Sequence, residues 1–196
     1  MMAPDQDKAR RRNRTMLVAI FGLFFGGMLI AGLLRFSGWR PEGMKNKGEM
    51  LQPYGDLREY TPTLSAGGSY HWNASPRTWR IVVAPTDCDG ARRDPCGKFL
   101  HQLDTVWQLM GKDADRVHVL WVGEPPAGVA MPREVHVVRG DAVLPAQLPQ
   151  GEGTTRSQGR DAAWLVDPNG FVVLRYAPGF DPGDLRSDVA RLLKVN

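Results

Sequence analysis

The sequence predicts one α/β domain that is preceded by a single transmembrane helix. Residues 16–34 form an unbroken run of nineteen uncharged, mostly apolar side chains near the start of the chain. Residues 79–122 contain two short apolar, β-branched runs on either side of an amphipathic helical pattern. Residues 162–194 contain two further β-prone runs around a turn, followed by a second helical pattern. Together these blocks indicate one membrane-spanning segment and one domain built on a mixed sheet.

The run from Met16 to Leu34 is long enough to cross a bilayer as a helix. Nineteen residues at about 1.5 Å of rise each give roughly 28 Å, close to the ~30 Å thickness of the hydrocarbon layer. A secretory signal peptide has a shorter apolar region, of about 7–15 residues, and ends in a small-x-small cleavage site. The run here ends in GLLRFSGW, which contains no such site. We therefore expect an uncleaved membrane anchor over residues 16–34.

The charges around the span predict its orientation. The fifteen residues before it carry five Lys or Arg side chains, and the fifteen after it carry four. Basic residues near a span tend to stay on the cytoplasmic side, and long domains cross largely regardless of their charge. We expect a protein of the bacterial inner membrane, with residues 1–15 as a cytoplasmic basic tail and the C-terminal domain in the periplasm.

Net charge gives no reason to expect nucleic-acid binding. The first fifteen residues contribute +3, from five basic side chains less Asp5 and Asp7, to a formal net charge of +4 for the whole chain. The remaining residues are therefore close to neutral. The basic character of the chain belongs to its membrane-flanking tail and favours a membrane, rather than a nucleic acid, as the partner.

Residues 35–70 are expected to form a juxtamembrane stalk and a first hairpin, and residues 71–196 the periplasmic domain. Gly, Pro and charged residues are frequent between residues 35 and 60, which disfavours a regular element early in this stretch. Gly67 and Gly68 lie between two short β-prone runs and predict a tight turn.

The periplasmic domain begins with a predicted β-α-β unit. Residues 79–84 (WRIVVA) and 117–122 (VHVLWV) are short apolar runs of the kind found in buried strands. Between them, apolar side chains recur at helical spacing and form one stripe along a helix over residues 97–110. A further short strand or sheet edge is expected at residues 134–138.

The C-terminal part predicts a β-β-α unit. Residues 162–166 (AAWLV) and 171–176 (FVVLRY) flank the turn residues DPNG, which favours an antiparallel hairpin. A helix over residues 184–194 closes the chain with one apolar face. The complete order, β-α-β, connector, β-β-α, is that of a thioredoxin-like fold.

The two cysteines of the chain, Cys88 and Cys96, lie between the first strand of that order and its helix. Two cysteines close in sequence, on the outer side of a membrane, are compatible with an oxidising compartment. Asp94 and Pro95 predict a helix start, with Asp94 as the cap and Pro95 at the first helical position. Cys96 would then lie in the first turn, where free amides stabilise a thiolate, so we expect it to be the more acidic thiol.

The residues alone leave three functions open for Cys88 and Cys96: a structural disulfide, a redox-active catalytic pair, and a copper or other metal site. The histidines do little to complete a metal site. His101 lies about 140° round the helix from Cys96, and His118, in an apolar run, is expected to be a satisfied core or edge histidine. Cu(I), a soft ion that two thiolates can hold, is the cofactor that this pair suggests.

Two segments, together with the N-terminal anchor, resemble the Sco/SenC family of cytochrome c oxidase assembly proteins: WRIVVAPTDCDGARRDPCGKFLHQL and WLVDPNGFVVLRY. The likeness is greatest to the small single-span relatives that accompany haem–copper oxidase genes, and it covers roughly residues 48–196. It implies a thioredoxin-like fold and help with oxidase assembly by thiol or copper handling at Cys88 and Cys96. The partners it implies are oxidase subunits or other assembly factors.

The sequence departs from that family at three points. The family has C-x-x-x-C, whereas seven residues separate Cys88 from Cys96. The position of its copper-binding His, about eight residues before the Asp of the turn, holds Gly159, and residues 154–163 lack the proline that thioredoxins place before the same strand. Two alternatives therefore stand beside oxidase assembly: a general periplasmic thiol–disulfide oxidoreductase, and a non-catalytic interaction module with a structural disulfide.

Overall fold

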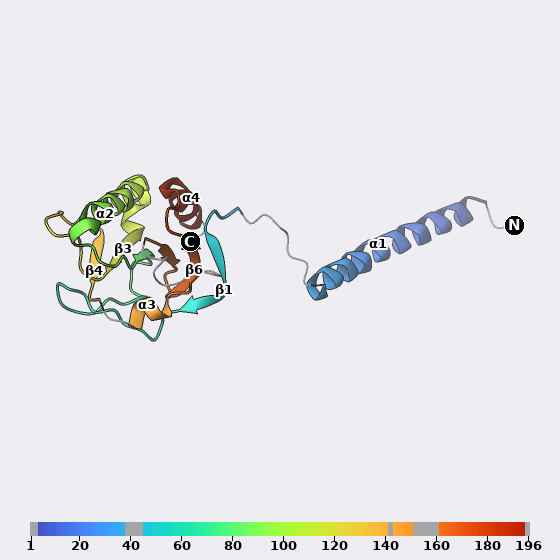
Figure 1. Ribbon diagram of the computed structural model, residues 1–196. Coiled ribbons are helices and arrows are strands. Elements are labelled where there is room, and N and C mark those ends of the chain that lie inside the picture. Colours follow the sequence, from blue (N-terminus) through green and yellow to red (C-terminus); the bar gives the residue numbers. More distant parts are fainter. Residues whose placement is uncertain (1–3, 38–44, 141–142, 151–160, 195–196) are drawn as a thin grey trace. The chain divides into compact units, whose positions relative to one another are not determined.

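The computed structural model describes residues 4–37, 45–140, 143–150 and 161–194. The chain divides into two compact units, Met1–Lys45 and Asn46–Asn196. The first contains one helix, α1, and the second is an α/β domain (Figure 1).

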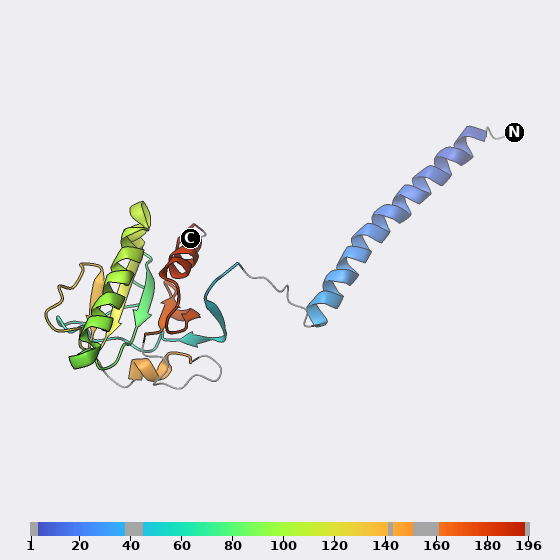
Figure 2. The same cartoon turned by 45° about the horizontal axis from the view of Figure 1, so that its top comes forward.

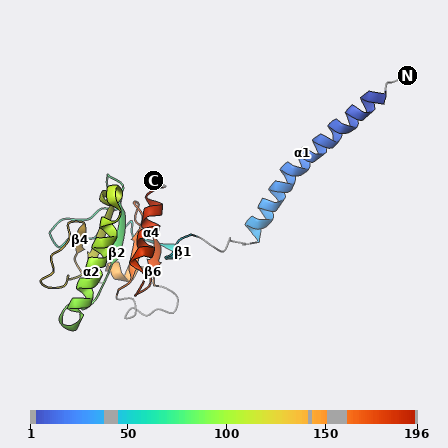
Figure 3. The same cartoon turned by 90° about the horizontal axis from the view of Figure 1, so that it is seen from above.

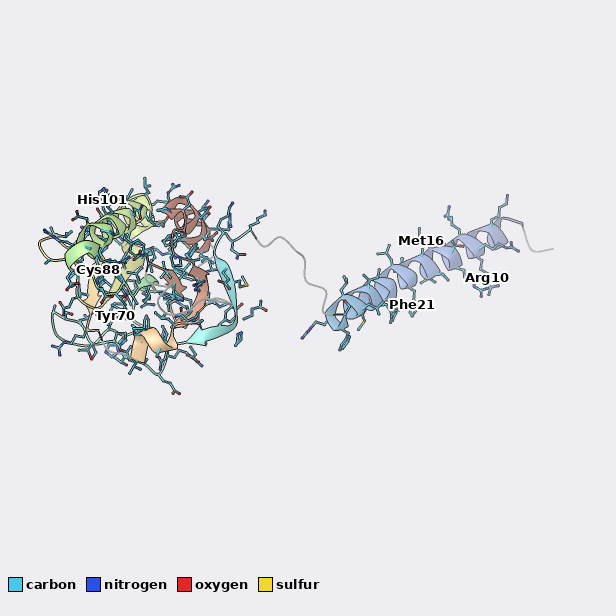
Figure 4. All side chains as sticks on the ribbon, viewed as in Figure 1. Arg10, Met16, Phe21, Tyr70, Cys88 and His101 are labelled. Atoms are coloured by element: carbon cyan, nitrogen blue, oxygen red, sulfur yellow. A yellow bond between two sulfur atoms is a disulfide. The ribbon has the colours of Figure 1, made fainter. Side chains whose placement is uncertain are left out.

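Helix α1 (Pro4–Phe36) contains the predicted span and extends beyond it at both ends. The basic residues before the apolar run are thus part of the same helix. Within α1, Arg10–Phe36 is long and apolar enough to cross a membrane. Its large apolar side chains, including Met16 and Phe21, are exposed (Figure 4). A helix that is apolar all round and uncovered by protein suits a lipid environment.

The domain contains one six-stranded mixed sheet with the order β1-β6-β5-β2-β3-β4. Its strands are β1 (Glu49–Asp56), β2 (Trp79–Val83), β3 (Val117–Val122), β4 (Val135–Val138), β5 (Ala163–Val166) and β6 (Phe171–Tyr176). Strands β2, β3 and β4 are parallel, whereas β5 is antiparallel to β2 and β6 is antiparallel to both β5 and β1. The central strands are buried on both faces, which explains their continuous apolar sequences.

Two helices, α2 (Arg93–Gln108) and α4 (Pro182–Leu192), lie side by side on one face of the sheet (Figure 1 and Figure 3). Two 3₁₀ turns, Gly90–Arg92 and Gly111–Arg116, flank α2. The apolar cluster on this face contains side chains from both helices and from the sheet, among them Phe99, Leu103, Leu185, Ile81 and Trp121.

The other face of the sheet is covered by the short helix α3 (Val143–Gln147) and by the segment before β2 (Figure 2). A second apolar cluster forms there, with Leu144 of α3 and with Leu57, Tyr70 and Trp72 of that segment. The turn predicted at Gly67 and Gly68 is present in this segment, where both residues have positive φ angles of 97° and 87°.

The predicted thioredoxin-like order is confirmed as β2-α2-β3 followed by β5-β6-α4, and β4 is the predicted sheet edge. The expectation of an irregular stalk was wrong for residues 49–56, which form β1. This strand pairs with β6 across the edge of the sheet, so its hydrogen bonds depend on residues far along the chain. Pro53 fits because the pairing shifts between Met50 and Gly55, where no ladder bond is required of it.

Candidate functional site

The candidate site is a disulfide bond between Cys88 and Cys96. The two residues are eight positions apart in sequence, with their Cα atoms 5.6 Å apart. Cys88 belongs to the loop that follows β2, and Cys96 belongs to α2. Just before Cys88, Asp87 has a φ of 58°, a left-handed conformation that Asp tolerates better than most residues. This turns the chain sharply as it leaves the central strand.

An ion pair joins the cysteine loop to the start of β5. Arg92 Nη2 donates to Asp161 Oδ1 at 2.6 Å, and both side chains are half-buried. Because β5 runs antiparallel to β2, Ala163 pairs with Val83, so the start of β5 lies at the end of the sheet where β2 finishes. A partly exposed pair of this kind contributes about 0–1 kcal/mol, so it positions the loop more than it stabilises the domain.

Helix α2 begins earlier than the sequence predicted. Its N-cap is Arg92, which is in the right-handed helical conformation and makes no side-chain cap bond, because the helix continues directly from the 3₁₀ turn. Asp94 and Pro95 are thus the second and third helical residues, and the predicted capping role of Asp94 was wrong. Cys96 is the fourth residue and remains in the first turn, although the preceding 3₁₀ turn already pairs the Arg93 amide with the Gly90 carbonyl, which weakens the expected stabilisation of a thiolate.

The two sulfur-bearing residues differ in exposure. Cys96 is 0% exposed and Cys88 is 8% exposed, and both belong to the apolar cluster under α2. Burial disfavours a thiolate and therefore opposes the helix-terminus effect expected for Cys96. Both cysteines are buried, and Cys88 is the less buried of the two.

A cavity of about 250 Å³ lies at the first turns of α2, and Pro95, the neighbour of Cys96 in sequence, is among the residues that line it. Its walls come from the first turns of α2, from the start of β5 and from the turn between β6 and α4, with the residues Pro95, Lys98, Phe99, Gln102, Asp161, Gly179 and Phe180. This volume is below the roughly 300–1,000 Å³ of a typical small-molecule pocket. The cavity has room for one or two side chains of a partner protein.

The part of the chain that the structure describes has no group of three or more His, Cys, Asp or Glu side chains placed to hold a metal ion. His101 is exposed on α2 (Figure 4). Gly159, which occupies the position of the family's copper-binding His, lies outside the described residues, as do residues 154–160. Within the described chain, Cys88 and Cys96 supply the soft donors that Cu(I) prefers, once the disulfide is reduced.

Sequence reasoning missed a polar network on the opposite face of the sheet. The Tyr70 hydroxyl lies 2.8 Å from Nδ1 of His118, and Nε of Arg80 donates to the same hydroxyl at 2.9 Å. Because an arginine N–H can only donate, the hydroxyl accepts from Arg80 and donates to Nδ1, which leaves the imidazole proton on Nε2. Burial, then the charges of His136 and Arg80, lower the pKa of His118 to about 4. His118 is half-buried and hydrogen-bonded, which agrees with the expected satisfied histidine, and its partner Tyr70 lies 48 positions away.

A family model described as transmembrane-like, thioredoxin-like, C-terminal domain matches residues 79–196. No curated protein matches the chain. Among solved structures, the chain is similar to BsSco, a member of the Sco family of cytochrome c oxidase assembly proteins in which a disulfide switch has been identified. The TM-score is 0.52, with 11% identity over 76% of this chain and 98% of that one. Trgpx in its apo form has a TM-score of 0.51 and 15% identity over 71% and 95% of the two chains. GPX1 of T. cruzi has a TM-score of 0.50 and 16% identity over 71% of this chain and 97% of that one. At these identities the likeness shows the thioredoxin-like fold alone.

Proposed function

Because the chain belongs to the family of transmembrane-like, thioredoxin-like C-terminal domains, we propose that it assists the assembly of a haem–copper cytochrome c oxidase through its cysteine pair. In this proposal α1 anchors the protein in the bacterial inner membrane and the α/β domain lies in the periplasm. The observation that carries the proposal is the Cys88–Cys96 disulfide, in which Cys96 is fully buried in the first turn of α2 and Cys88, in the preceding loop, is 8% exposed. The shared fold with BsSco, an oxidase assembly protein, supports the choice of target.

Thiol–disulfide exchange with a partner dithiol follows from this geometry. One partner thiolate attacks Sγ of Cys88, the bond to Cys96 breaks, and Cys96 leaves as a thiolate beside the first amides of α2. The second partner thiol then attacks the mixed disulfide and releases Cys88. Two electrons and two protons pass from the partner, which leaves with a disulfide, to this chain, which ends with two thiols.

The reduced pair would also accept Cu(I) as cargo. Two thiolates are soft donors that suit this ion. Since the described residues contain no group of three or more His, Cys, Asp or Glu side chains that could hold a metal ion, a further ligand would come from the partner. An ion held by two ligands here and one elsewhere is suited to transfer more than to storage.

The cavity at the first turns of α2 supports a protein as the reaction partner. Phe99 and Phe180 contact each other at its apolar wall, with ring centroids 6.2 Å apart. Lys98 and Asp161 add one charge of each sign at the same cavity. A partner segment that places an apolar side chain next to its cysteine would fill this space and bring its thiol to Cys88.

Gene deletion with complementation tests the proposed function. Deletion is expected to lower both cytochrome c oxidase activity and copper per oxidase, and the wild-type gene should restore both. The Cys88→Ser/Cys96→Ser gene, expressed to the same level, should restore neither. Full restoration by the double variant would favour an interaction module with a structural disulfide, and an unaffected oxidase in the deletion strain would refute the role in assembly.

The reduction potential of the pair separates exchange from a structural role. An exchanging disulfide should have a potential between about −120 and −270 mV, as thiol–disulfide oxidoreductases do, whereas a value below about −300 mV would indicate a structural bond. If the potential lies in the exchange range but oxidase assembly is intact in the deletion strain, the general oxidoreductase alternative is favoured.

The orientation of the span is tested by reporter fusions after the C-terminal residue, Asn196. Alkaline phosphatase, which needs an oxidising compartment to form its disulfides, should be active there. An inactive phosphatase together with an active cytoplasmic reporter at the same position would reverse the topology and remove the periplasmic role.

A further inference from the structure

Arg175 is a buried cation with an unused hydrogen-bonding edge. It lies on β6, its side chain is 2% exposed, and its Nη1 donates to Oε2 of Glu49 at 3.1 Å. Its Nε and Nη2 have no hydrogen-bond partner among the described residues. Buried donors without a partner are rare in native proteins, because each has given up its hydrogen bonds to water. Such an edge is therefore a candidate for a ligand.

The chain itself shows what that edge binds. In Arg58 the same two atoms contact the carboxylate of Asp56, with Nε 3.0 Å from Oδ1 and Nη2 2.7 Å from Oδ2. The two N–H groups point the same way along one side of the planar guanidinium and match a pair of oxygens. The free edge of Arg175 has the same shape, so a planar group with two oxygens fits it.

Arg175 also lines a cavity of about 370 Å³. A second cation, Lys47, lines the same cavity and has no ion pair among the described residues. Three carboxylates line it too. Each either accepts a hydrogen bond from the chain or has its charge offset by a helix dipole. Glu49 is bound by Nη1 of Arg175, as described above. Asp181 accepts from the amide of Gly183, and Asp184 lies in the first turn of α4, where the amide dipoles offset its charge.

We propose that this cavity, called here the Arg175 cavity, binds a carboxylate. Nε and Nη2 of Arg175 hold its two oxygens, and Lys47 attracts its charge. The turn residues Gly179 and Phe180 border both this cavity and the one at the first turns of α2, the helix that carries Cys96. An acidic side chain of a protein that docks at the cysteines is thus the source that the position favours. The carboxylate site itself stands on Arg175 and does not depend on the redox or copper role.

Entry to the site requires neighbouring side chains to move. Nε and Nη2 of Arg175 are covered in the structure, whereas the Glu49 side chain is 47% exposed and lies on the edge strand β1. Rotamer changes of exposed side chains take picoseconds to nanoseconds and do not limit binding. Removing the competing carboxylate, with Glu49→Gln, should therefore tighten the binding of an added carboxylate.

Nuclear magnetic resonance of arginine side chains tests the proposal on the full-length chain in detergent micelles. Sodium acetate is added at constant ionic strength, with sodium chloride as the reference. The Arg175 Nε–H signal, identified by its loss in Arg175→Lys, should shift saturably with a dissociation constant in the millimolar range. Arg175→Lys keeps the charge and removes the paired donors, so acetate-induced changes at neighbouring amides should weaken at least tenfold. The matched control Arg58→Lys should leave acetate binding unchanged.

Three results would overturn the assignment: no saturable shift in the wild-type chain, equal titration of Arg175→Lys and wild type, or tighter binding of inorganic phosphate than of acetate. If Arg175→Lys loses its circular dichroism spectrum, Lys47→Ala replaces it, because that side chain is exposed. Weaker acetate binding is expected there, and unchanged binding would count against the proposal. The Cys88→Ser/Cys96→Ser chain should bind acetate normally, which keeps this test separate from that of the proposed function.

Discussion

Reduction of the Cys88–Cys96 bond should lower the free energy of unfolding without unfolding the domain. The bond joins residues eight positions apart, so it restricts only a short loop in the unfolded chain. The loop-closure model gives about 2.5 kcal/mol for nine residues at 25 °C. The apolar cluster under α2 does not depend on the bond, because most of its members, such as Leu103 and Trp121, come from α2 and the sheet.

Chemical reduction is the cleaner perturbation, since it leaves both sulfur atoms in place. The double variant Cys88→Ala/Cys96→Ala also removes the sulfur of Cys96 from a fully buried position, and we expect about 1 kcal/mol of additional loss from the space it leaves. The difference between the reduced wild type and the variant thus separates loop closure from packing.

Urea unfolding of the full-length chain in detergent, followed by tryptophan fluorescence and circular dichroism, measures the loss from loop closure and the loss from packing. The six tryptophans of the chain supply the fluorescence. A loss below about 0.5 kcal/mol on reduction would refute the loop-closure reasoning. Loss of all secondary structure would refute the claim that the apolar clusters hold the fold, and with it the exchange mechanism, which needs a folded reduced state.

Three further predictions concern single side chains. In the reduced chain, iodoacetamide should modify Cys88 before Cys96, because Cys96 is fully buried; mass spectrometry checks the order, and modification of Cys96 first would restore the helix-terminus argument. Asp188→Asn should lower the free energy of urea unfolding by about 2–4 kcal/mol, because one buried carboxylate oxygen accepts from Tyr176 and from two backbone amides. Because the pKa of His118 is lowered to about 4, the unfolded chain binds more protons between about pH 6.5 and pH 4, and stability should fall by about 1–2 kcal/mol as the pH drops through that window. His118→Gln should remove this part of the pH dependence, and an unchanged pH profile in that variant would contradict the assignment.

Local chemistry explains why much of the fold could be predicted from sequence. The apolar run at residues 117–122 coincides with β3, because a strand buried on both faces needs apolar side chains throughout. The DPNG turn was equally predictable. Asp167 Oδ1 accepts from the amides of Asn169, Gly170 and Phe171, so the turn is stabilised within five residues.

Elements that depend on distant residues could not be predicted. Strand β1 contains Pro53 and no apolar alternation, and it is ordered by pairing with β6, where Glu49 lies opposite Arg175, 126 positions away. Helix α3 is one short turn with a proline inside it, so no periodic pattern marks it. The start of α2 was misplaced because the 3₁₀ turn at Gly90–Arg92 delivers the chain already in a helical conformation, which makes a capping side chain unnecessary.

The candidate site combines one fixed sulfur with one that reduction would release. Cys96 is held in place because it is itself buried and the apolar stripe that follows it, from Phe99 onward, packs α2 against the sheet. Cys88 lies in a loop whose other tether is the pair between Arg92 and Asp161, worth at most about 1 kcal/mol. In the proposed exchange, opening of the disulfide leaves Cys88 held by this pair and by its own packing in the apolar cluster, while Cys96 is held by α2. This asymmetry suits the proposed transfer of a disulfide or a Cu(I) ion to another protein. Asp161→Asn weakens the ion pair with Arg92 without changing either sulfur, so this variant should speed the exchange of Cys88 with a partner thiol.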